Sequence, residues 1–298
     1  MYQILKKRKL SEKICLMKIR AERIARKCLP GEFLIIRIDE QGERIPLTIC
    51  DFNREEGTVV IVVQVVGATS YRLVRDFNEG DSIADVVGPL GNPSDLTKKT
   101  PEELKKMHIL FVAGGLGAAP VYPQVKWLVE QGVVPDVVQG SKTKDMVILE
   151  KEMRALAGDH LYITTDDGTY GFHGMVTAKV EDLVKNEGRH YDLCVAIGPM
   201  VMMKFVAKLT KELGIPTVAS MDPIMVDGTG MCGACRLLVG GEVKFACVDG
   251  PEFDAHQVDF DQAIKRARMY KTEEGRAFLK VQEGETHHGG CGNCGGEA

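Results

Sequence analysis

The first hundred residues alternate short apolar runs with turn signals, a pattern typical of β-strands. Residues 33–38 and 58–63 are rich in Ile and Val, and the Gly-containing stretches 40–42 and 55–57 read as turns. No segment in this part of the chain has a convincing helical period. We therefore expect residues 1–100 to form a small antiparallel β-barrel.

After Pro101 the pattern changes to an alternation of helices and strands. Residues 101–107 look helical, and a glycine-rich turn after the first strand leads into a helix with one apolar face. The predicted strands are 108–113, 136–138, 161–164, 193–197 and 217–219. This alternation predicts a doubly wound parallel α/β sheet, with a domain spanning 101–222.

The remainder of the chain is too short for a large core of its own. Residues 223–262 are rich in Gly and Cys and form a predicted small domain, and an amphipathic segment at 260–280 is expected to close the fold. The last part, 263–298, is predicted to be a C-terminal helix and a mobile tail of Gly, His, Glu and Cys.

Composition places the chain among globular proteins, with 44% hydrophobic and 27% charged residues. A net charge of −4 is too small to favour nucleic acid as the main partner. No apolar run reaches the roughly 18 residues of a membrane span, and the N-terminus lacks a signal-peptide core, so we expect a cytoplasmic protein with no membrane contact.

The N-terminal stretch is locally basic, beginning with the run at 6–9. A transit peptide or a docking patch is one interpretation. The alternation of Met17, Lys18, Ile19 and Arg20 favours the other, in which the charges lie on the solvated face of a strand.

The nine cysteines are distributed unevenly, and a disulfide framework is not expected in a cytoplasmic protein. Cys15, Cys28, Cys50 and Cys194 stand alone in apolar contexts and are predicted to be buried bystanders. The others form two groups that need a chemical explanation. These are Cys232, Cys235 and Cys247, and then Cys291 and Cys294.

The glycine-rich loop that starts at Asp227 is the strongest chemical signal. Plant-type [2Fe–2S] proteins use the spacing C-x4-C-x2-C with a distant fourth Cys. Here Asp227 replaces the first Cys, Cys232 and Cys235 follow at that spacing, and Cys247 comes after a hairpin expected to turn at Gly240-Gly241. Glycines allow such a loop to point its ligands inward and its amides at the cluster.

A structural zinc site is the alternative interpretation of these four side chains, because a carboxylate is an acceptable zinc ligand. The spacing and the glycines favour the cluster. An oxygen ligand in place of a thiolate should shift the redox potential of the cluster and could couple it to a proton.

A second glycine-rich turn lies between the first predicted strand and helix of the α/β domain. Its sequence is Gly114-Gly115-Leu116-Gly117, with Pro120 shortly after it. Such a turn lets the backbone approach a pyrophosphate at a helix N-terminus. Gly198, Pro199 and Met200 form another turn at the carboxyl edge of the sheet, where doubly wound folds bind ligands.

The barrel holds a weaker signal, in which Arg44 precedes Pro46, Leu47 and Thr48. An arginine fork beside small-residue turns could hold the diphosphate of FAD. Physical reasoning alone favours an ordinary exposed arginine on an edge strand.

These three motifs, in this order along nearly the whole chain, resemble the ferredoxin–NADP reductase superfamily. The branch is the one with the electron-transfer subunit of dihydroorotate dehydrogenase, which 87–91, 165–168 and 249–251 also resemble. The resemblance implies FAD at Arg44, Pro46, Leu47, Thr48, Gln64, Val65, Gly67, Thr69 and Ser70. It implies nicotinamide nucleotide at Gly114, Gly115, Leu116, Gly117, Pro120, Gly140, Ser141, Asp166, Gly198, Pro199 and Met200.

The residue at position 227 distinguishes between two closely related groups within this superfamily. The dihydroorotate dehydrogenase subunit would have Cys at position 227, whereas Asp227 resembles the small subunit of NADH-dependent reduced ferredoxin:NADP oxidoreductase, an electron-bifurcating enzyme. That resemblance implies a larger iron–sulfur flavoprotein partner, ferredoxin reached through it, and NAD(H) as substrate. Lys142 could meet a 2′-phosphate or be a solvated loop residue, and the family favours NAD(H).

We expect an oxidoreductase subunit with FAD, a [2Fe–2S] cluster and NAD(H), in which hydride transfer needs no side-chain acid or base. Three alternatives stay open: the dihydroorotate dehydrogenase partner, a stand-alone ferredoxin reductase, and a zinc-containing nucleotide sensor. For the tail cysteines with His287 and His288, mobile thiols are favoured over a metal site.

Overall fold

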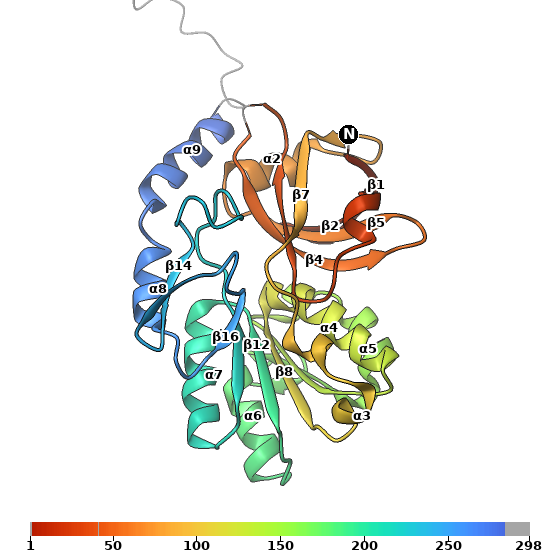
Figure 1. The fold of residues 1–298 in the computed structure, drawn as a ribbon, viewed down its shortest axis with the longest axis vertical. Helices are drawn as coiled ribbons and strands as arrows, with labels where there is room; N and C mark the ends of the chain where they lie inside the picture. The colour runs from red at the N-terminus through yellow and green to blue at the C-terminus, as the bar shows by residue number, and fades with distance from the viewer. Residues whose placement is uncertain (1, 41, 284–298) are drawn as a thin grey trace, which may run out of the picture.

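The computed structural model describes residues 2–40 and 42–283, and its N-terminal part is a curled antiparallel sheet. The strands follow one another in the order β6 (Ser82–Ile83), β1 (Tyr2–Ser11), β2 (Ile14–Arg20), β5 (Thr58–Gln64), β4 (Ile45–Asn53), β3 (Phe33–Arg37) and β7 (Asp85–Leu90). The edge strands β6 and β7 are separated along the chain by Ala84 alone, so the sheet nearly closes on itself (Figure 1). The predicted barrel is confirmed.

The alternation along β2 sorts its side chains between core and solvent. Met17 and Ile19 are buried, while Arg20 is exposed. The basic run at 6–9 lies on β1, where the ammonium group of Lys7 donates to the carbonyl oxygens of Val74 and Phe77. The basic residues are therefore part of a strand, as the alternation predicts.

The expectation that the barrel part has no helix was wrong. It contains α1 (Glu22–Ala25) and α2 (Ala68–Asp76). The small residues at the start of α2 resemble a turn, and the helix is only nine residues long. Leu73 anchors the helix, because its side chain is fully buried in the barrel core. The free energy gained by this apolar burial outweighs the weak helix propensity of the segment.

The second sheet is predominantly parallel. Its order is β11 (Phe172–His173), β10 (Leu161–Thr165), β9 (Asp136–Ser141), β8 (Ile109–Gly114), β12 (Leu193–Ile197), β13 (Thr217–Ser220) and β16 (Glu252–Asp254), with β16 antiparallel. The helices of this part are α3 (Pro101–Leu104), α4 (Ala118–Glu130), α5 (Glu150–Ala157), α6 (Val176–Lys185) and α7 (Met200–Glu212).

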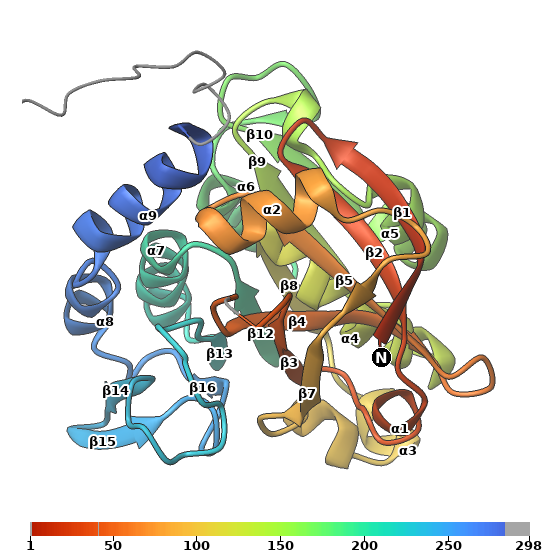
Figure 2. The ribbon, with the colours of Figure 1, turned by 90° about the horizontal axis from the view of Figure 1, so that it is seen from above.

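Helices cover both faces of this sheet. Along β8, Leu110 and Val112 pack into a core with α6 and α7, while Phe111 and Ala113 pack into a second core with α4 and α5. Alternate side chains of one buried strand therefore serve two cores, which confirms the doubly wound prediction. Figure 2 shows the helices on either side of the sheet.

The C-terminal segment is joined to both larger units. A hairpin of β14 (Arg236–Val239) and β15 (Glu242–Phe245) turns at Gly240 and Gly241, whose φ angles are +59° and +83°. The predicted amphipathic segment at 260–280 is two helices rather than one, α8 (Phe260–Arg266) and α9 (Lys271–Glu283). α9 reaches the barrel, where Phe278 makes an edge contact with Tyr71 of α2 at 5.4 Å between ring centroids.

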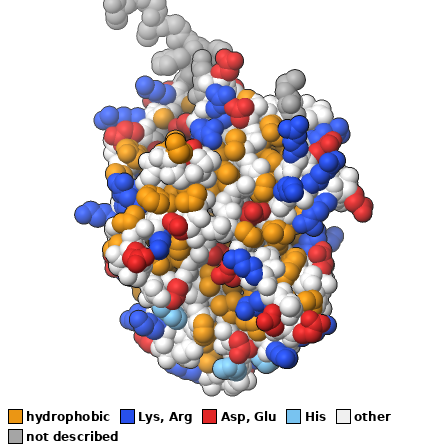
Figure 3. All heavy atoms as spheres, in the orientation of Figure 1, with side chains coloured by type: hydrophobic (Ala, Val, Ile, Leu, Met, Phe, Trp, Pro, Cys, Tyr) orange, Lys and Arg blue, Asp and Glu red, His pale blue; other side chains and the backbone are white. Residues whose placement is uncertain are grey.

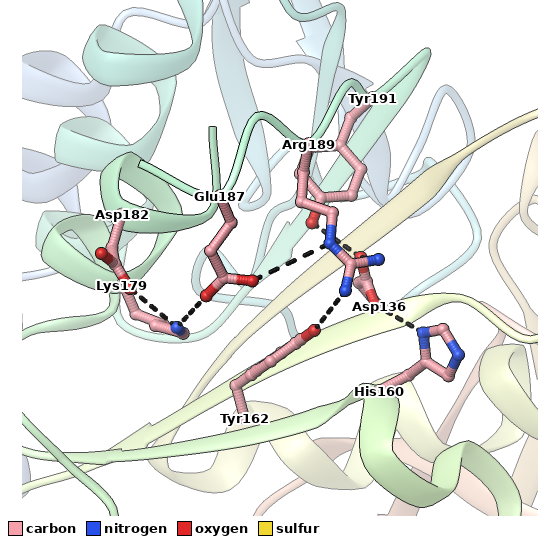
Figure 4. A network of polar contacts seen from close by, with 8 residues as sticks. All are labelled: Asp136, His160, Tyr162, Lys179, Asp182, Glu187, Arg189 and Tyr191. Atoms are coloured by element: carbon pink, nitrogen blue, oxygen red, sulfur yellow. Dashed lines mark hydrogen bonds and ion pairs between the residues drawn. The ribbon is translucent and has the colours of Figure 1, made fainter. Parts of the chain in front are cut away.

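A polar network braces the amino ends of β9 and β10, at the opposite edge of the sheet from the glycine turns (Figure 4). The buried Asp136 accepts hydrogen bonds from the hydroxyl of Tyr191 at 2.7 Å and pairs with His160 Nδ1 at 2.7 Å. Lys179 bridges to Glu187 at 2.8 Å. Burial and the Asp136 carboxylate raise the pKa of Tyr191, which keeps its hydroxyl protonated as a hydrogen-bond donor in this network.

The four isolated cysteines are all buried, as predicted, and burial raises the pKa of the Cys15 thiol to about 11. Figure 3 shows acidic and basic side chains intermixed over the face seen in Figure 1. Within 2–40 and 42–283, no helix combines the length and apolarity that crossing a bilayer requires. The tail residues Cys291, Cys294, His287 and His288 lie outside the described residues.

Candidate functional site

The barrel residues predicted to hold FAD come from three neighbouring segments. Pro46, Leu47 and Thr48 lie in β4, and Gln64 and Val65 lie at the end of β5. The first turn of α2 supplies the rest. Its Thr69 hydroxyl donates to the carboxylate of Glu43 at 2.6 Å, which ties α2 to the segment that carries Arg44.

The start of α2 has the features of an anion site. Gly67 is its N-cap, and a Cβ added there would meet nothing within 4 Å. The open backbone at the N-terminus of a nine-residue helix suits a negatively charged group. The Ser70 hydroxyl accepts hydrogen bonds from the amides of Val66 and Gly67, at 2.9 and 3.0 Å, so its role is to shape this turn. These residues fit a diphosphate.

Arg44 is neither exposed nor on an edge strand, so its interpretation as an ordinary surface arginine was wrong. It is half-buried and leads into β4, which lies between β5 and β3. Its Nε donates to the carbonyl oxygen of Val226 at 2.9 Å, and its NH2 group donates to that of Asp227 at 3.4 Å. The arginine of the barrel motif therefore contacts the loop predicted to hold the cluster.

Two glycine turns meet at the carboxyl edge of the parallel sheet. A Cβ on Gly117 would lie 2.0 Å from the carbonyl oxygen of Ile197, and a Cβ on Gly198 would lie 2.9 Å from backbone atoms of Gly114. These glycines are required because two backbones touch. Gly115 differs, since its φ is +53° and its Cβ position is open. It offers free backbone to a pyrophosphate before α4.

The other predicted nucleotide residues are distributed around the same edge. Gly140 allows α6 to pack closely, since its Cβ would lie 2.3 Å from Val176. The Ser141 hydroxyl donates to Met146 O at 3.2 Å, and the amide of Asp166 donates to Ser141 O at 3.0 Å. The remaining positions are Leu116 in the glycine turn, Pro120 in α4, Pro199 as the N-cap of α7, and Met200 at its start.

The cluster loop brings two of its four predicted ligands together. The thiols of Cys235 and Cys247 are buried, with their sulfurs 3.3 Å apart, while Cys232 is exposed. Asp227 accepts hydrogen bonds from the amides of Thr229 and Met231, at 2.9 and 3.0 Å. Over 2–40 and 42–283, no group of three or more His, Cys, Asp or Glu side chains converges on a metal position.

The loop nonetheless has the chemistry that an iron–sulfur cluster needs. Backbone amides, Ala234 first, lower the pKa of the Cys232 thiol, whereas burial raises that of Cys247 to about 11. Amides directed at sulfur favour the thiolate form and tune a cluster. Asp227, Cys232 and Cys235 on the glycine-rich loop, with Cys247 returned to it by the hairpin, fit the group.

Sequence reasoning missed two residues that hold this loop. Asn92, just beyond β7, donates from Nδ2 to Val248 O at 2.9 Å, and Arg266 of α8 donates to Ala234 O at 3.2 Å. Their targets are backbone atoms far away in sequence, so no motif or periodicity marks them.

Asp222 also escaped notice, although it follows β13 at the carboxyl edge of the sheet. Its side chain has an exposed face, yet surrounding protein atoms raise its pKa to about 6. A carboxyl group with a raised folded-state pKa stabilises the protein fully below its unfolded pKa, and that stability is lost as the pH rises through about 6.

Asp222→Asn should therefore raise the melting temperature of the holoprotein above pH 6 and leave it unchanged below about pH 4. Thermal melts across this pH range measure the difference. A difference in melting temperature between variant and wild type that is the same at every pH would show that the pKa of Asp222 is not raised in the folded protein.

Comparison with known proteins identifies the cluster segment. Residues 222–259 match the iron–sulfur cluster binding domain of dihydroorotate dehydrogenase B. A homologue of the dihydroorotate dehydrogenase B electron transfer subunit from Thermotoga maritima is 44% identical over 272 residues, 91% of this chain and 92% of its own. The electron transfer subunit from Geobacillus thermodenitrificans is 31% identical over 261 residues, which cover 86% of this chain and 96% of its own.

Solved structures extend the likeness to the whole fold. A chain of the NADH-dependent reduced ferredoxin–NADP oxidoreductase, studied for flavin-based electron bifurcation, is 42% identical. It superposes with a TM-score of 0.84 over 95% of this chain and 98% of its own length. A cytochrome P450 reductase from Amycolatopsis, 17% identical with a TM-score of 0.58 over 71% of this chain and 65% of its own, shares the fold alone.

These likenesses confirm the predicted superfamily and the predicted cofactor classes. The match at the cluster loop supports iron–sulfur chemistry over structural zinc. The chain belongs to the family of dihydroorotate dehydrogenase B electron-transfer subunits and their homologues, oxidoreductase subunits of the ferredoxin–NADP reductase superfamily that use FAD, an iron–sulfur cluster and NAD(H).

Proposed function

We propose that this chain is the subunit that exchanges hydride with NAD(H) and transfers single electrons in an electron-bifurcating ferredoxin–NADP(H) oxidoreductase. The observation that carries the proposal is Asp227, which stands where the dihydroorotate dehydrogenase subunit would have Cys. The 42% identity over almost the full length to the NADH-dependent reduced ferredoxin–NADP oxidoreductase chain supports it. The partner would be a larger iron–sulfur flavoprotein that exchanges electrons with ferredoxin.

Each part of the chain has a defined task in this proposal. Residues 1–100 hold FAD, with Arg44 to Thr48 and the start of α2 as its contacts. Residues 101–222 bind NAD(H) over the glycine turns, and 223–262 hold a [2Fe–2S] cluster through Asp227, Cys232, Cys235 and Cys247. When bound, FAD takes up a hydride from NADH and the cluster carries single electrons.

The chain's own residues act by binding and orientation. The open backbone at Gly115 and the N-terminus of α4 receive the negative charge of the nucleotide, and the open N-terminus of α2 receives that of the flavin diphosphate. Close backbone contact between Gly117 and Ile197 fixes the turn, so the nucleotide meets a preorganised surface. No side-chain acid or base is assigned to the hydride step.

The test is to purify the native complex through an affinity tag on this chain and to identify its partner. We expect a larger iron–sulfur flavoprotein, and NADP⁺ reduction that requires both NADH and reduced ferredoxin. A partner that oxidises dihydroorotate would replace the proposal with the pyrimidine pathway alternative. Full ferredoxin reductase activity in a monomer would replace it with a stand-alone reductase.

Asp227→Cys should retain the cluster but change its redox potential and electron paramagnetic resonance (EPR) spectrum, because a thiolate replaces an oxygen ligand. An anaerobic redox titration measures both. Asp254→Asn in β16 is the control, since its carboxylate caps a turn outside the cluster loop. A variant at 227 with wild-type potential and spectrum would show that Asp227 is not a ligand.

A further inference from the structure

Two barrel-side residues hold the two ends of the cluster segment. Arg44 donates to the carbonyl oxygens of Val226 and Asp227, at the first predicted ligand. The amide of Asn92 donates to Gly250 O at 2.7 Å and its side chain donates to Val248 O, next to the last predicted ligand. In Figure 1 the cluster segment, drawn in cyan, lies alongside the barrel.

Between these two anchors the loop rests directly on the barrel. Gly228 has a φ of +81°, and a Cβ there would lie 2.6 Å from Ile35 and 2.9 Å from Leu90. Phe33 and Ile35 of β3 share one hydrophobic core with Cys235 and Cys247. The position of the loop relative to the flavin-binding barrel is therefore fixed by packing and by hydrogen bonds.

The two anchors differ in charge. Both hold the loop by hydrogen bonds, but only Arg44 also acts on it electrostatically. Asn92 is neutral, whereas Arg44 places a guanidinium beside Asp227. Both hydrogen bonds of Arg44 are made to neutral carbonyl oxygens, so its positive charge still acts on the loop. A half-buried cation at this position interacts more strongly than one in bulk water.

We infer that Arg44 is a positioning residue for the iron–sulfur cluster, which holds the Asp227 end of the loop on the barrel and stabilises the reduced cluster with its charge. The inference rests on the proposed function, since it requires the cluster. Uptake of one electron from the reduced flavin adds one negative charge to the cluster, and a nearby cation favours that form. The same side chain therefore links the flavin-binding barrel to the electron acceptor.

The test compares Arg44→Gln, which removes the charge, with Arg44→Lys, which keeps it but loses the planar fork. Arg54→Gln is the matched control, because Arg54 is a barrel arginine that donates to the carbonyl oxygen of Cys28. The first readout is the cluster potential, from EPR during anaerobic titration, with FAD bound and after its removal. The second is amide hydrogen exchange over 226–231.

In Arg44→Gln we expect a more negative potential, so that the ratio of reduced to oxidised cluster at fixed ambient potential falls about fivefold. This shift persists without FAD. In Arg44→Lys the redox potential of the cluster stays close to the wild-type value, because the positive charge is kept. Amide hydrogen exchange over 226–231 is faster in both Arg44 variants. Arg54→Gln has the wild-type potential and exchange rates. If Arg44→Gln does not fold or loses its iron, faster exchange in Arg44→Lys sustains the inference and unchanged exchange overturns it.

Wild-type potential and exchange in both Arg44 variants, or a shift that vanishes when FAD is removed, overturns the inference alone. A wild-type protein without iron would instead contradict the proposed function. The two failures are therefore distinguishable in the same set of samples.

Discussion

Cys247→Ala should abolish binding of the iron–sulfur cluster while FAD and its reduction by NADH are retained. Cys247 follows the hairpin in sequence and is buried, with its sulfur 3.3 Å from that of Cys235. Its loss leaves a ligand position open in a buried site, because the neighbouring Cys235 is itself a predicted ligand, and a cluster held by thiolates does not survive that loss. Iron and inorganic sulfide analysis with EPR measures the loss.

Cys194→Ala provides the control for this experiment, because Cys194 is equally buried but lies in β12 within the core of the α/β unit. Its removal should lower stability and leave the iron content unchanged. NADH should bleach the flavin in both variants. Full iron content in Cys247→Ala would remove that residue from the ligand set.

Gly117→Ala should lower the free energy of unfolding by about 3 kcal/mol and abolish NADH binding. The backbone of Gly117 is helical, with φ of −57°, so alanine meets no conformational penalty there. The penalty is steric, because the new Cβ would lie 2.0 Å from a carbonyl oxygen of β12. Urea unfolding and NADH titration measure the two effects.

Gly115→Ala is the informative comparison, two residues earlier in the same turn. Its φ of +53° costs alanine about 1 kcal/mol, but no atom lies within 4 Å of the new Cβ. Here we expect a small loss of stability and an increase in the NADH dissociation constant of about tenfold, because the methyl group occupies the open backbone face. Equal losses of stability in the two variants would contradict the assignment of separate roles.

The two-sheet fold was predictable because its periodicities are strong. Long Ile- and Val-rich runs such as 58–63 become central strands, and the alternation along β8 follows from burial on both faces. The short helices α1 and α2 were not predictable, whereas α3 was, since Pro101 marks its start. α2 has Gly67 as its N-cap and opens with Ala68, Thr69 and Ser70, and it is helical because tertiary burial of Leu73 overrides local propensity.

The candidate site was predictable where its chemistry is local in sequence. The spacing of Cys232 and Cys235 and the glycines of the nucleotide turn each form a motif of a few residues, so their function can be inferred from a short stretch of sequence. The contact of Arg44 with Val226 spans 182 positions and depends on how two units pack, which no local pattern encodes. The same is true of Asn92, whose neighbours in sequence give no sign of its partner.

The most direct test of the account is an anaerobic NADH titration of the purified chain, followed by optical and EPR spectroscopy with metal and flavin analysis. We predict FAD and iron with inorganic sulfide in the protein, bleaching of the flavin by NADH, and the EPR signal of a reduced [2Fe–2S] cluster. A colourless protein that contains zinc and no iron, and that NADH does not reduce, would contradict the account.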